Sequence, residues 1–350
     1  MCSIGLATGC GDSAPSVDAG PVRPDAQVGW ALGVPLPEAI ANNALASVET
    51  EGGCMVFSML GIDSTLGVPG IHNRSFRWRE GDDSWLAMPA IPGPGRLAAN
   101  AVGLRDEPYL IGGYEVSSGG GETSSTSLQR FNLSTGQWDS LADIPVPIDD
   151  AGVVAWRDRY IVVVSGWSNN SNVAAVQIYD ADTDSWLMGT DFPGIPVFGS
   201  AAAIAGDELI IIDGVSSGIV GFRIENHAWR ATLDPNSPAT IEWTELGAHP
   251  GPARYRAAAG TSESGALWFH GGTEEPYNFD GQRYDNGQAA TPLASTMVYE
   301  AGAFALDEVP DKPVATMDHR SLVACGSKLL TVGGLIAGPS ATPQTWTIIP

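Results

Sequence analysis

A glycine recurs at intervals of about fifty residues along this chain, each time directly after a short apolar run. Around each glycine, period-two alternation and Gly, Asn or Asp turns are typical of four short antiparallel strands. Such a sheet cannot cover both of its own faces, so its copies must pack against one another. The sequence therefore predicts an all-β repeat protein whose units are marked by Gly61, Gly113, Gly166, Gly214, Gly272 and Gly334.

Six units of this length, each with a glycine after its second strand, are typical of a six-bladed kelch β-propeller. The last unit ends one strand short, and the segment Gly29–Leu36 resembles the fourth-strand phrases of the other units. We therefore expect the last blade to combine strands from both termini, which closes the ring. The predicted propeller spans residues 28–350.

Residues 1–27 are rich in Ala, Asp, Pro and Gly and have no periodicity, so they are predicted to be a disordered leader. Within the leader, LATGC resembles a bacterial lipobox, with Cys10 as the lipidated residue; an accidental match is the alternative. The sequence thus predicts an exported periplasmic or cell-surface lipoprotein, attached to the membrane only by its lipid.

The chain carries 40 acidic and 17 basic residues, for a formal charge of −23. Such a surface repels nucleic acid and anionic headgroups, so neither is an expected partner. Cys54 and Cys325 fall at equivalent heights in neighbouring predicted blades. We expect two separate buried thiols there, with a disulfide as the alternative in an oxidising compartment.

Propellers usually bind ligands at one mouth of the central channel, where the crossovers that precede the first strands converge. Basic and aromatic crossover residues suit an anionic or hydroxylated ligand, because guanidinium groups bind carboxylates and aromatic rings stack on sugars. The ligand-binding candidates are Asn43, Arg96, Phe198, Arg254, Tyr255, Arg256 and Arg320. The alternative for each arginine is a structural role in capping carbonyls or pairing with a carboxylate.

Acid and base candidates lie at the same crossovers: Asp149, Asp150 and His319. A long polar and aromatic loop after Gly272 adds Glu274 and Tyr277, and loops of this length on a rigid scaffold often bind ligands. No His or Cys spacing resembles a zinc site, and no nucleotide fingerprint is present, so no metal or cofactor is predicted.

The order of GPGRLAANAVGLRDEPYLIGG, QRFNLSTGQWDSL and the unit ending in ALWFHGG resembles the bacterial N-acetylneuraminate epimerases (sialic acid mutarotases). Galactose oxidase-like kelch proteins share these motifs. The epimerase resemblance implies interconversion of sugar anomers, with Arg96 matching the family's arginine before a first strand. The family's catalytic Glu directly follows the glycine of a central blade, and Val215 occupies that position here. Glu115 and Glu274 are possible substitutes.

Three functions follow. The first is binding of a small anionic or polyhydroxylated ligand, a sugar acid or glycan, at the channel mouth. The second is a mutarotase or epimerase, an isomerase, acting at the same mouth. The third is a scaffold that binds another protein.

Overall fold

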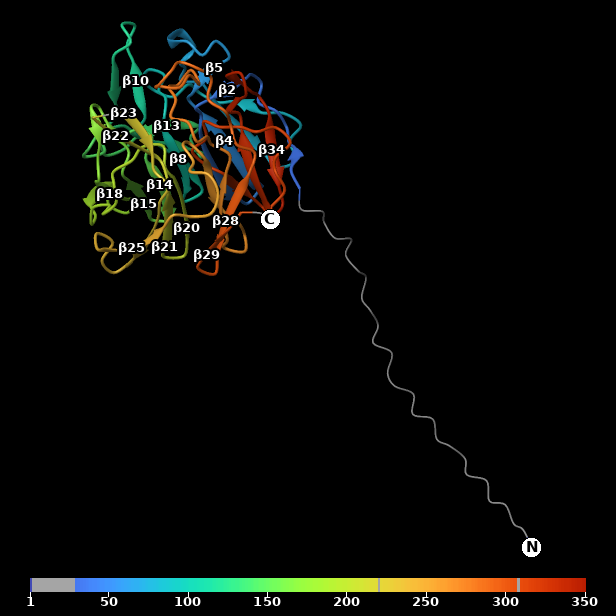
Figure 1. Ribbon diagram of the computed structural model, residues 1–350. Helices are drawn as coiled ribbons and strands as arrows, with labels where there is room; N and C mark the ends of the chain where they lie inside the picture. The colour runs from blue at the N-terminus through green and yellow to red at the C-terminus, as the bar shows by residue number, and fades with distance from the viewer. Residues whose placement is uncertain (2–28, 220, 307–308) are drawn as a thin grey trace.

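The computed structural model describes residue 1 and residues 29–219, 221–306 and 309–350. It is an all-β propeller of six four-stranded antiparallel sheets, as the sequence predicts (Figure 1). The predicted leader and its Cys10 lipidation site lie outside the described residues. Among the described residues, no helix has the length and apolar character needed to cross a membrane.

The first three blades follow the chain order predicted from the glycine repeat. Blade 1 contains β3 (Ala44–Thr50), β4 (Gly53–Met59), β6 (Ser75–Arg79) and β7 (Leu86–Ala87). Blade 2 contains β8 (Asn100–Leu104), β9 (Glu107–Ile111), β12 (Leu128–Asn132) and β13 (Gln137–Ser140). Blade 3 contains β14 (Gly152–Trp156), β15 (Tyr160–Val164), β18 (Val176–Asp180) and β19 (Ser185–Met188).

The remaining blades complete the ring. Blade 4 contains β20 (Ala201–Ala205), β21 (Glu208–Ile212), β24 (Ala228–Leu233) and β25 (Ile241–Gly247). Blade 5 contains β26 (Ala258–Thr261), β27 (Leu267–His270), β28 (Thr296–Glu300) and β29 (Ala303–Ala305). Blade 6 contains β30 (Val323–Cys325), β31 (Lys328–Val332), β34 (Thr345–Ile348) and β1 (Ala31–Leu32).

The ring closes through blade 6, where β1 pairs antiparallel with β34 and places Ala31 opposite Thr347. This confirms the predicted closure by both termini. A disulfide between Cys54 of β4 and Cys325 of β30 also joins blades 1 and 6, with a Cα–Cα distance of 5.4 Å. The prediction of two separate thiols was therefore wrong, because closure brings two residues 271 positions apart within bonding distance.

Small residues on the innermost strands let neighbouring blades approach closely. Gly260 on β26 is the clearest case, since a Cβ at this position would lie 1.8 Å from the carbonyl oxygen of Leu322 in blade 6. Large side chains instead pack between blades further from the axis. Trp156, Tyr160 and Phe192, for example, belong to one cluster shared by blades 3 and 4.

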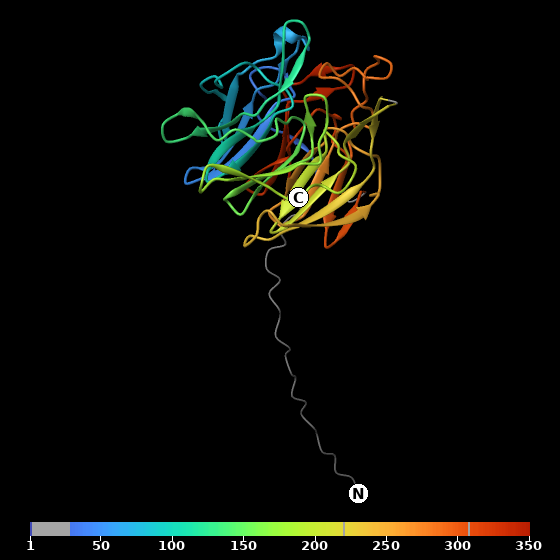
Figure 2. The ribbon, with the colours of Figure 1, turned by 90° about the vertical axis from the view of Figure 1, so that its left-hand side faces the viewer.

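Short hairpins connect the second and third strands at one end of the propeller. They include β10–β11 (Tyr114–Val116, Glu122–Ser124), β16–β17 (Trp167–Ser168, Ser171–Asn172) and β22–β23 (Val215–Gly218, Gly221–Ile224). Figures 1 and 2 show the hairpin β10–β11 at the same end of the molecule as the 3₁₀ helix η1 (Val68–Gly70). We call this end the upper mouth.

Candidate functional site

Six equivalent residues, one from each blade, surround the axis at the upper mouth. We call them the axial ring: Asn42, Ala98, Asp150, Gly199, Arg256 and Asp318. All six have left-handed backbone conformations, with φ between 48° and 68°. Such a conformation costs a non-glycine residue about 1–2 kcal/mol. Hydrogen bonds between blades hold part of the ring in place: the amide of Asp150 donates to Ala98 O (3.0 Å), and that of Arg256 donates to Gly199 O (2.8 Å).

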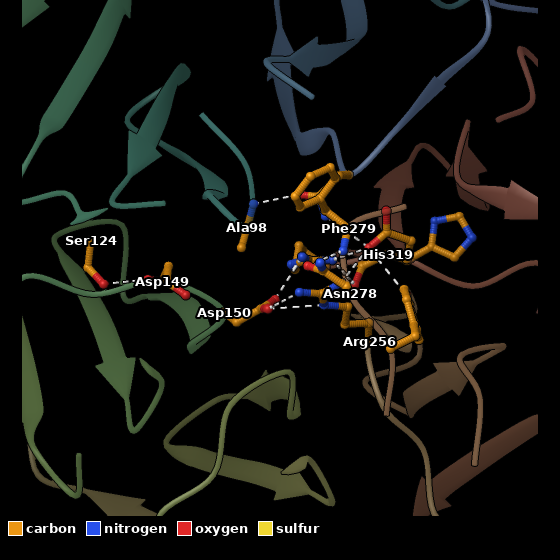
Figure 3. A network of polar contacts seen from close by, with 12 residues as sticks. Ala98, Ser124, Asp149, Asp150, Arg256, Asn278, Phe279 and His319 are labelled. Carbon is orange, nitrogen blue, oxygen red and sulfur yellow. Dashed lines mark hydrogen bonds and ion pairs between the residues drawn. The ribbon is translucent and has the colours of Figure 1, made fainter. Parts of the chain in front are cut away.

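Charged side chains of the axial ring form a closed network with Arg320 (Figure 3). Asp150 accepts hydrogen bonds from Arg256 Nε (3.0 Å) and Nη2 (2.6 Å), and Arg320 Nη2 lies 2.7 Å from Asp150 Oδ1. Asp318 Oδ1 lies 3.5 Å from Arg256 and 3.3 Å from Arg320. Tyr277 also donates to Asp318 (3.2 Å). Two guanidinium groups thus face two carboxylates, and their charges balance inside the protein.

Burial lowers the pKa of these arginines, whereas the neighbouring carboxylates raise it. Arg256 is only 2% exposed, and burial by itself lowers its pKa. Burial is the largest single effect, but Asp150, Tyr255, Tyr277 and Asp318 together outweigh it and hold the pKa of Arg256 well above its usual value. The rings of Tyr255 and Tyr277 lie 4.7 Å and 5.0 Å from the Arg256 guanidinium carbon, which adds cation–π stabilisation. Arg256 therefore stays charged, and its contacts stabilise the arrangement of residues around the axis.

A cavity of about 240 Å³ lies at this mouth, with Asp150 and Arg256 in its lining. Blade 2 contributes the hairpin β10–β11, blade 3 the crossover and β16, blade 4 the crossover and β23, and blade 5 its crossover and long loop. Five aromatic residues and four polar or charged residues complete the lining with Asp150: Tyr114, Trp167, Phe198, Phe222, Tyr284, Glu122, Asp149, Arg256 and Asn278. We call this space the mouth cavity.

Asp149 breaks the pattern of the fold at this cavity. In each blade, the residue before the axial ring pairs with the residue that follows the repeat glycine, as in Asp149 with Trp167 and Phe198 with Val215. The corresponding residues in the other blades are apolar or aromatic: Ala41, Leu97, Phe198, Tyr255 and Met317. Asp149 thus places a carboxyl group, 4% exposed, where the repeat otherwise buries hydrocarbon or an aromatic ring.

Among the described residues, only one oxygen of the Asp149 carboxyl accepts a hydrogen bond. Ser124 Oγ donates to Asp149 Oδ2 (2.6 Å), and Asp149 forms no ion pair among the described residues (Figure 3). Burial, and then the neighbouring charge of Asp150, raise the pKa of Asp149 well above its usual value. Burial also raises the pKa of Glu122 across the cavity. A carboxyl with a raised pKa keeps its proton to a higher pH than usual, which suits a group that donates and accepts protons.

A second cavity of about 450 Å³ adjoins the mouth cavity, because Phe222 and Tyr284 line both. The centroids of their rings are 4.5 Å apart, so the two side chains form a common wall. Glu274 also lines this outer cavity, as do Glu275 and Arg283, which form an ion pair at 2.5 Å.

The structure sorts the predicted site residues into three groups. Asp149, Asp150, Phe198 and Arg256 line the mouth cavity, and Glu274 lines the outer one. Tyr255, Tyr277 and Arg320 contact residues of the axial network without lining either cavity. The remaining candidates are placed elsewhere: Asn43, Arg96, Glu115, Arg254 and His319.

Four of these remaining candidates are hydrogen-bonded within the fold, among them Asn43, whose Nδ2 donates to Ser58 Oγ (2.8 Å). Arg96 donates to Gln129 (2.8 Å) and Ser125 (3.3 Å), and Arg254 donates to the carbonyl oxygens of Gly271 (2.9 Å) and Ser295 (3.1 Å). The contacts of Arg254 match the structural alternative of capping carbonyls, whereas Arg96 bonds to a side-chain amide and a hydroxyl instead. His319 Nε2 contacts the Thr316 hydroxyl at 2.8 Å, and burial holds the pKa of His319 well below its usual value.

Four lining residues were not identified from the sequence: Tyr114, Glu122, Trp167 and Phe222. Tyr114 and Trp167 directly follow repeat glycines, so aligning the repeats would have pointed to them. Glu122 and Phe222 lie on hairpins whose sequences do not repeat. Val215, which stands where the resembling family has a catalytic Glu, is fully buried and pairs with Phe198.

No group of three or more His, Cys, Asp or Glu among the described residues is arranged to hold a metal ion.

Comparisons with known proteins agree with the fold. Kelch-like protein terF of Aspergillus terreus is 29% identical over 135 residues, which cover 37% of this chain and 28% of that protein. Beta-scruin of Limulus polyphemus is 25% identical over 174 residues, which cover 47% of this chain and 18% of that protein. The matches thus span less than a third of these relatives' length. No family model matches the chain.

The solved structure of YjhT superposes with a TM-score of 0.71 at 17% sequence identity, covering 89% of this chain and 95% of that one. This likeness extends over nearly the whole propeller. The chain is therefore a six-bladed kelch-repeat β-propeller.

Proposed function

We propose that this propeller binds a small polyhydroxylated ligand, a sugar, in the mouth cavity. The observation that carries the proposal is Asp149, a buried carboxyl in a position that the repeat otherwise fills with apolar or aromatic side chains. Burying a polar group in this way is costly unless a partner compensates for it. A ligand hydroxyl in the cavity is such a partner.

The rest of the cavity suits a sugar ring. Aromatic side chains such as Trp167 and Tyr284 offer faces on which the apolar side of a pyranose can stack, and the Asn278 amide can both donate and accept hydrogen bonds. The mouth cavity has a volume of about 240 Å³, just below the range of about 300–1,000 Å³ that is typical of pockets for drug-sized ligands. A single sugar ring suits a cavity of this size. An anionic sugar fits less well, because Asp150 and Asp318 already neutralise Arg256 and Arg320.

Calorimetric titration with a panel of monosaccharides tests the proposal. Replacing Trp167 with Leu should weaken binding about tenfold or more, whereas Trp186→Leu on the outer strand of the same blade should leave affinity unchanged. Circular dichroism would verify that both variants are folded. Equal affinity of the two variants, or no binding of any sugar by the unaltered protein, would overturn the proposal.

Catalysis of sugar mutarotation is a second candidate, favoured by the raised pKa of Asp149. Opening and closing a sugar ring requires a proton donor and a proton acceptor. Asp149 as the acid and an ionised carboxylate such as Glu122 as the base would meet this requirement in one cavity. NMR measurement of anomer exchange tests it: the protein should accelerate exchange and Asp149→Asn should abolish the acceleration, whereas a pure binding protein leaves the rate unchanged.

Export of the protein is also part of the proposal. The Cys54–Cys325 disulfide supports it, because disulfides persist mainly in oxidising compartments. Labelling of intact cells with a membrane-impermeant reagent would test export, and loss of the lipid on Cys10→Ala, followed by mass spectrometry, would test the predicted anchor.

A further inference from the structure

The mouth cavity has more negative than positive charge. Its lining contains three carboxyl groups, on Glu122, Asp149 and Asp150, and among the described lining residues the guanidinium of Arg256 is the single basic group. That guanidinium is bonded to Asp150 and lies within 3.5 Å of Asp318. Arg256 is therefore engaged by Asp150 and Asp318, and neither Glu122 nor Asp149 forms an ion pair among the described residues.

Asp149 also has an acceptor available to a ligand. The residue is only 4% exposed to solvent, and it lines the cavity. Its Oδ2 accepts from Ser124, whereas its Oδ1 has no hydrogen bond or ion pair among the described residues. A carboxylate oxygen that lines a cavity accepts its strongest hydrogen bonds from charged donors such as an ammonium group.

The aromatic lining favours a cation for a separate reason. Trp167 makes edge-to-face contacts with Phe198 (centroids 5.4 Å apart) and Phe222 (6.0 Å), which fix the orientation of the three rings. The π-faces of such rings carry negative potential and attract ammonium groups. A cage of aromatic rings beside carboxylates is a known solution for binding amines.

The outer cavity extends this charge pattern toward solvent. Glu274, Glu275 and Asp285 line it, and its one described basic residue, Arg283, is paired with Glu275 and Asp285. A cation approaching the mouth cavity past Phe222 and Tyr284 would meet negative potential along its path, in a chain whose formal charge is −23.

We infer that the mouth cavity selects a ligand with a protonated amine, a sugar whose ring carries a free ammonium group, which binds between Glu122 and Asp149 against the aromatic wall. This inference rests on the proposed sugar-binding function and specifies its ligand class. An N-acetylated or neutral sugar offers the same ring and hydroxyl groups without the positive charge, so it would lack the ion pairs with these carboxyl groups.

Matched sugars test the inference directly. Glucosamine, N-acetylglucosamine and glucose share one ring and differ at a single carbon, as do the three galactose and three mannose counterparts. We expect the amino sugar of at least one set to bind about tenfold or more tightly than its neutral and acetylated partners, with a preference that declines as salt increases. Choline, a cation without a sugar ring, serves as a further probe.

Three variants test which residues cause the preference for amino sugars. Glu122→Gln and Asp149→Asn should each reduce the amino-sugar preference, measured as the ratio of amino-sugar to neutral-sugar affinity, at least about threefold. Glu263→Gln, an exposed residue away from the mouth cavity, makes the same change in net charge and should leave the preference intact. Thermal melting of each variant would show that it is folded.

The outcomes distinguish this inference from the function on which it rests. Equal affinity for charged, acetylated and neutral sugars would leave sugar binding standing and overturn amine selection. A preference retained in both carboxyl variants would overturn it too. Binding of choline as tightly as amino sugars would support cation selection and overturn the sugar proposal, whereas no binding by any probe would overturn both.

Discussion

The Cys54–Cys325 disulfide should contribute a large share of the propeller's stability, because it closes a very long loop. The two cysteines are separated by 271 positions and join the first and last blades. In the chain-entropy description, cross-linking a loop of this length removes about 5–6 kcal/mol of conformational freedom from the unfolded chain at 25 °C. Strain in the folded state or residual structure in the unfolded state would reduce this value.

Urea unfolding of the oxidised and reduced forms measures the contribution. A Cys2→Ser, Cys10→Ser background removes the other two thiols, so that a reductant acts only on this bond. We expect the reduced protein to be less stable by several kcal/mol and to have a larger m-value, since its unfolded chain exposes more surface. The double variant Cys54→Ala, Cys325→Ala should unfold like the reduced form and be indifferent to reductant.

A difference below about 1 kcal/mol between the two forms would refute the reasoning. It would mean that the pairing of β1 with β34 alone brings blades 1 and 6 together, or that the unfolded chain is already compact. An unchanged m-value together with a large loss of stability would instead place the effect of the bond in the folded state.

Three other predictions concern buried charges. Lys312→Met should stabilise the fold by at least about 1 kcal/mol in thermal or urea unfolding, because burial disfavours the charged form and lowers the pKa of Lys312 to about 7. Asp150→Ala should destabilise it by about 3–5 kcal/mol, because Arg256 and Arg320 both lose a buried partner; wild-type stability would contradict this. Burial lowers the pKa of His72 to about 4 and that of His270 well below 6.5. These residues stay neutral in the fold but bind protons when unfolded, so the urea midpoint should fall between pH 7 and pH 5, and a flat profile would exclude this linkage.

The fold could be predicted because its determinants are local and repeated. The glycine after each second strand, the turns and the alternating apolar residues recur in every blade, so each copy supports the assignment of the others. Even the closure by Gly29–Leu36 could be predicted, since that segment resembles the other fourth strands, and β1 lies within it.

The Cys54–Cys325 bond was not predicted for the opposite reason. It depends on how closely β4 and β30 approach after the ring has closed, which no local pattern records. Distance between Cα atoms, 5.4 Å here, decides whether two cysteines can be joined.

The arginines show a similar limit at the site. Arg254 and Arg256 are two residues apart in the sequence, yet Arg254 caps carbonyl groups of its own blade while Arg256 reaches the axis. The left-handed turn at Arg256 directs this difference, and its partners Asp150 and Asp318 come from other blades. A crossover sequence can therefore show that charges gather near the axis, but the pairing of those charges depends on the assembled ring.

What distinguishes a ligand site from a structural network here is the departure from six-fold repetition. In the axial network, Asp150 and Asp318 balance the charges of Arg256 and Arg320, so the network explains its residues without a ligand. Asp149 has no such explanation: its counterparts in the other blades are apolar or aromatic, and its contact with Ser124 compensates only one oxygen. A repeat protein keeps a destabilising departure from its repeat where function requires it. The buried carboxyl of Asp149 is such a departure, so it indicates the ligand site more reliably than a cluster of charged residues does.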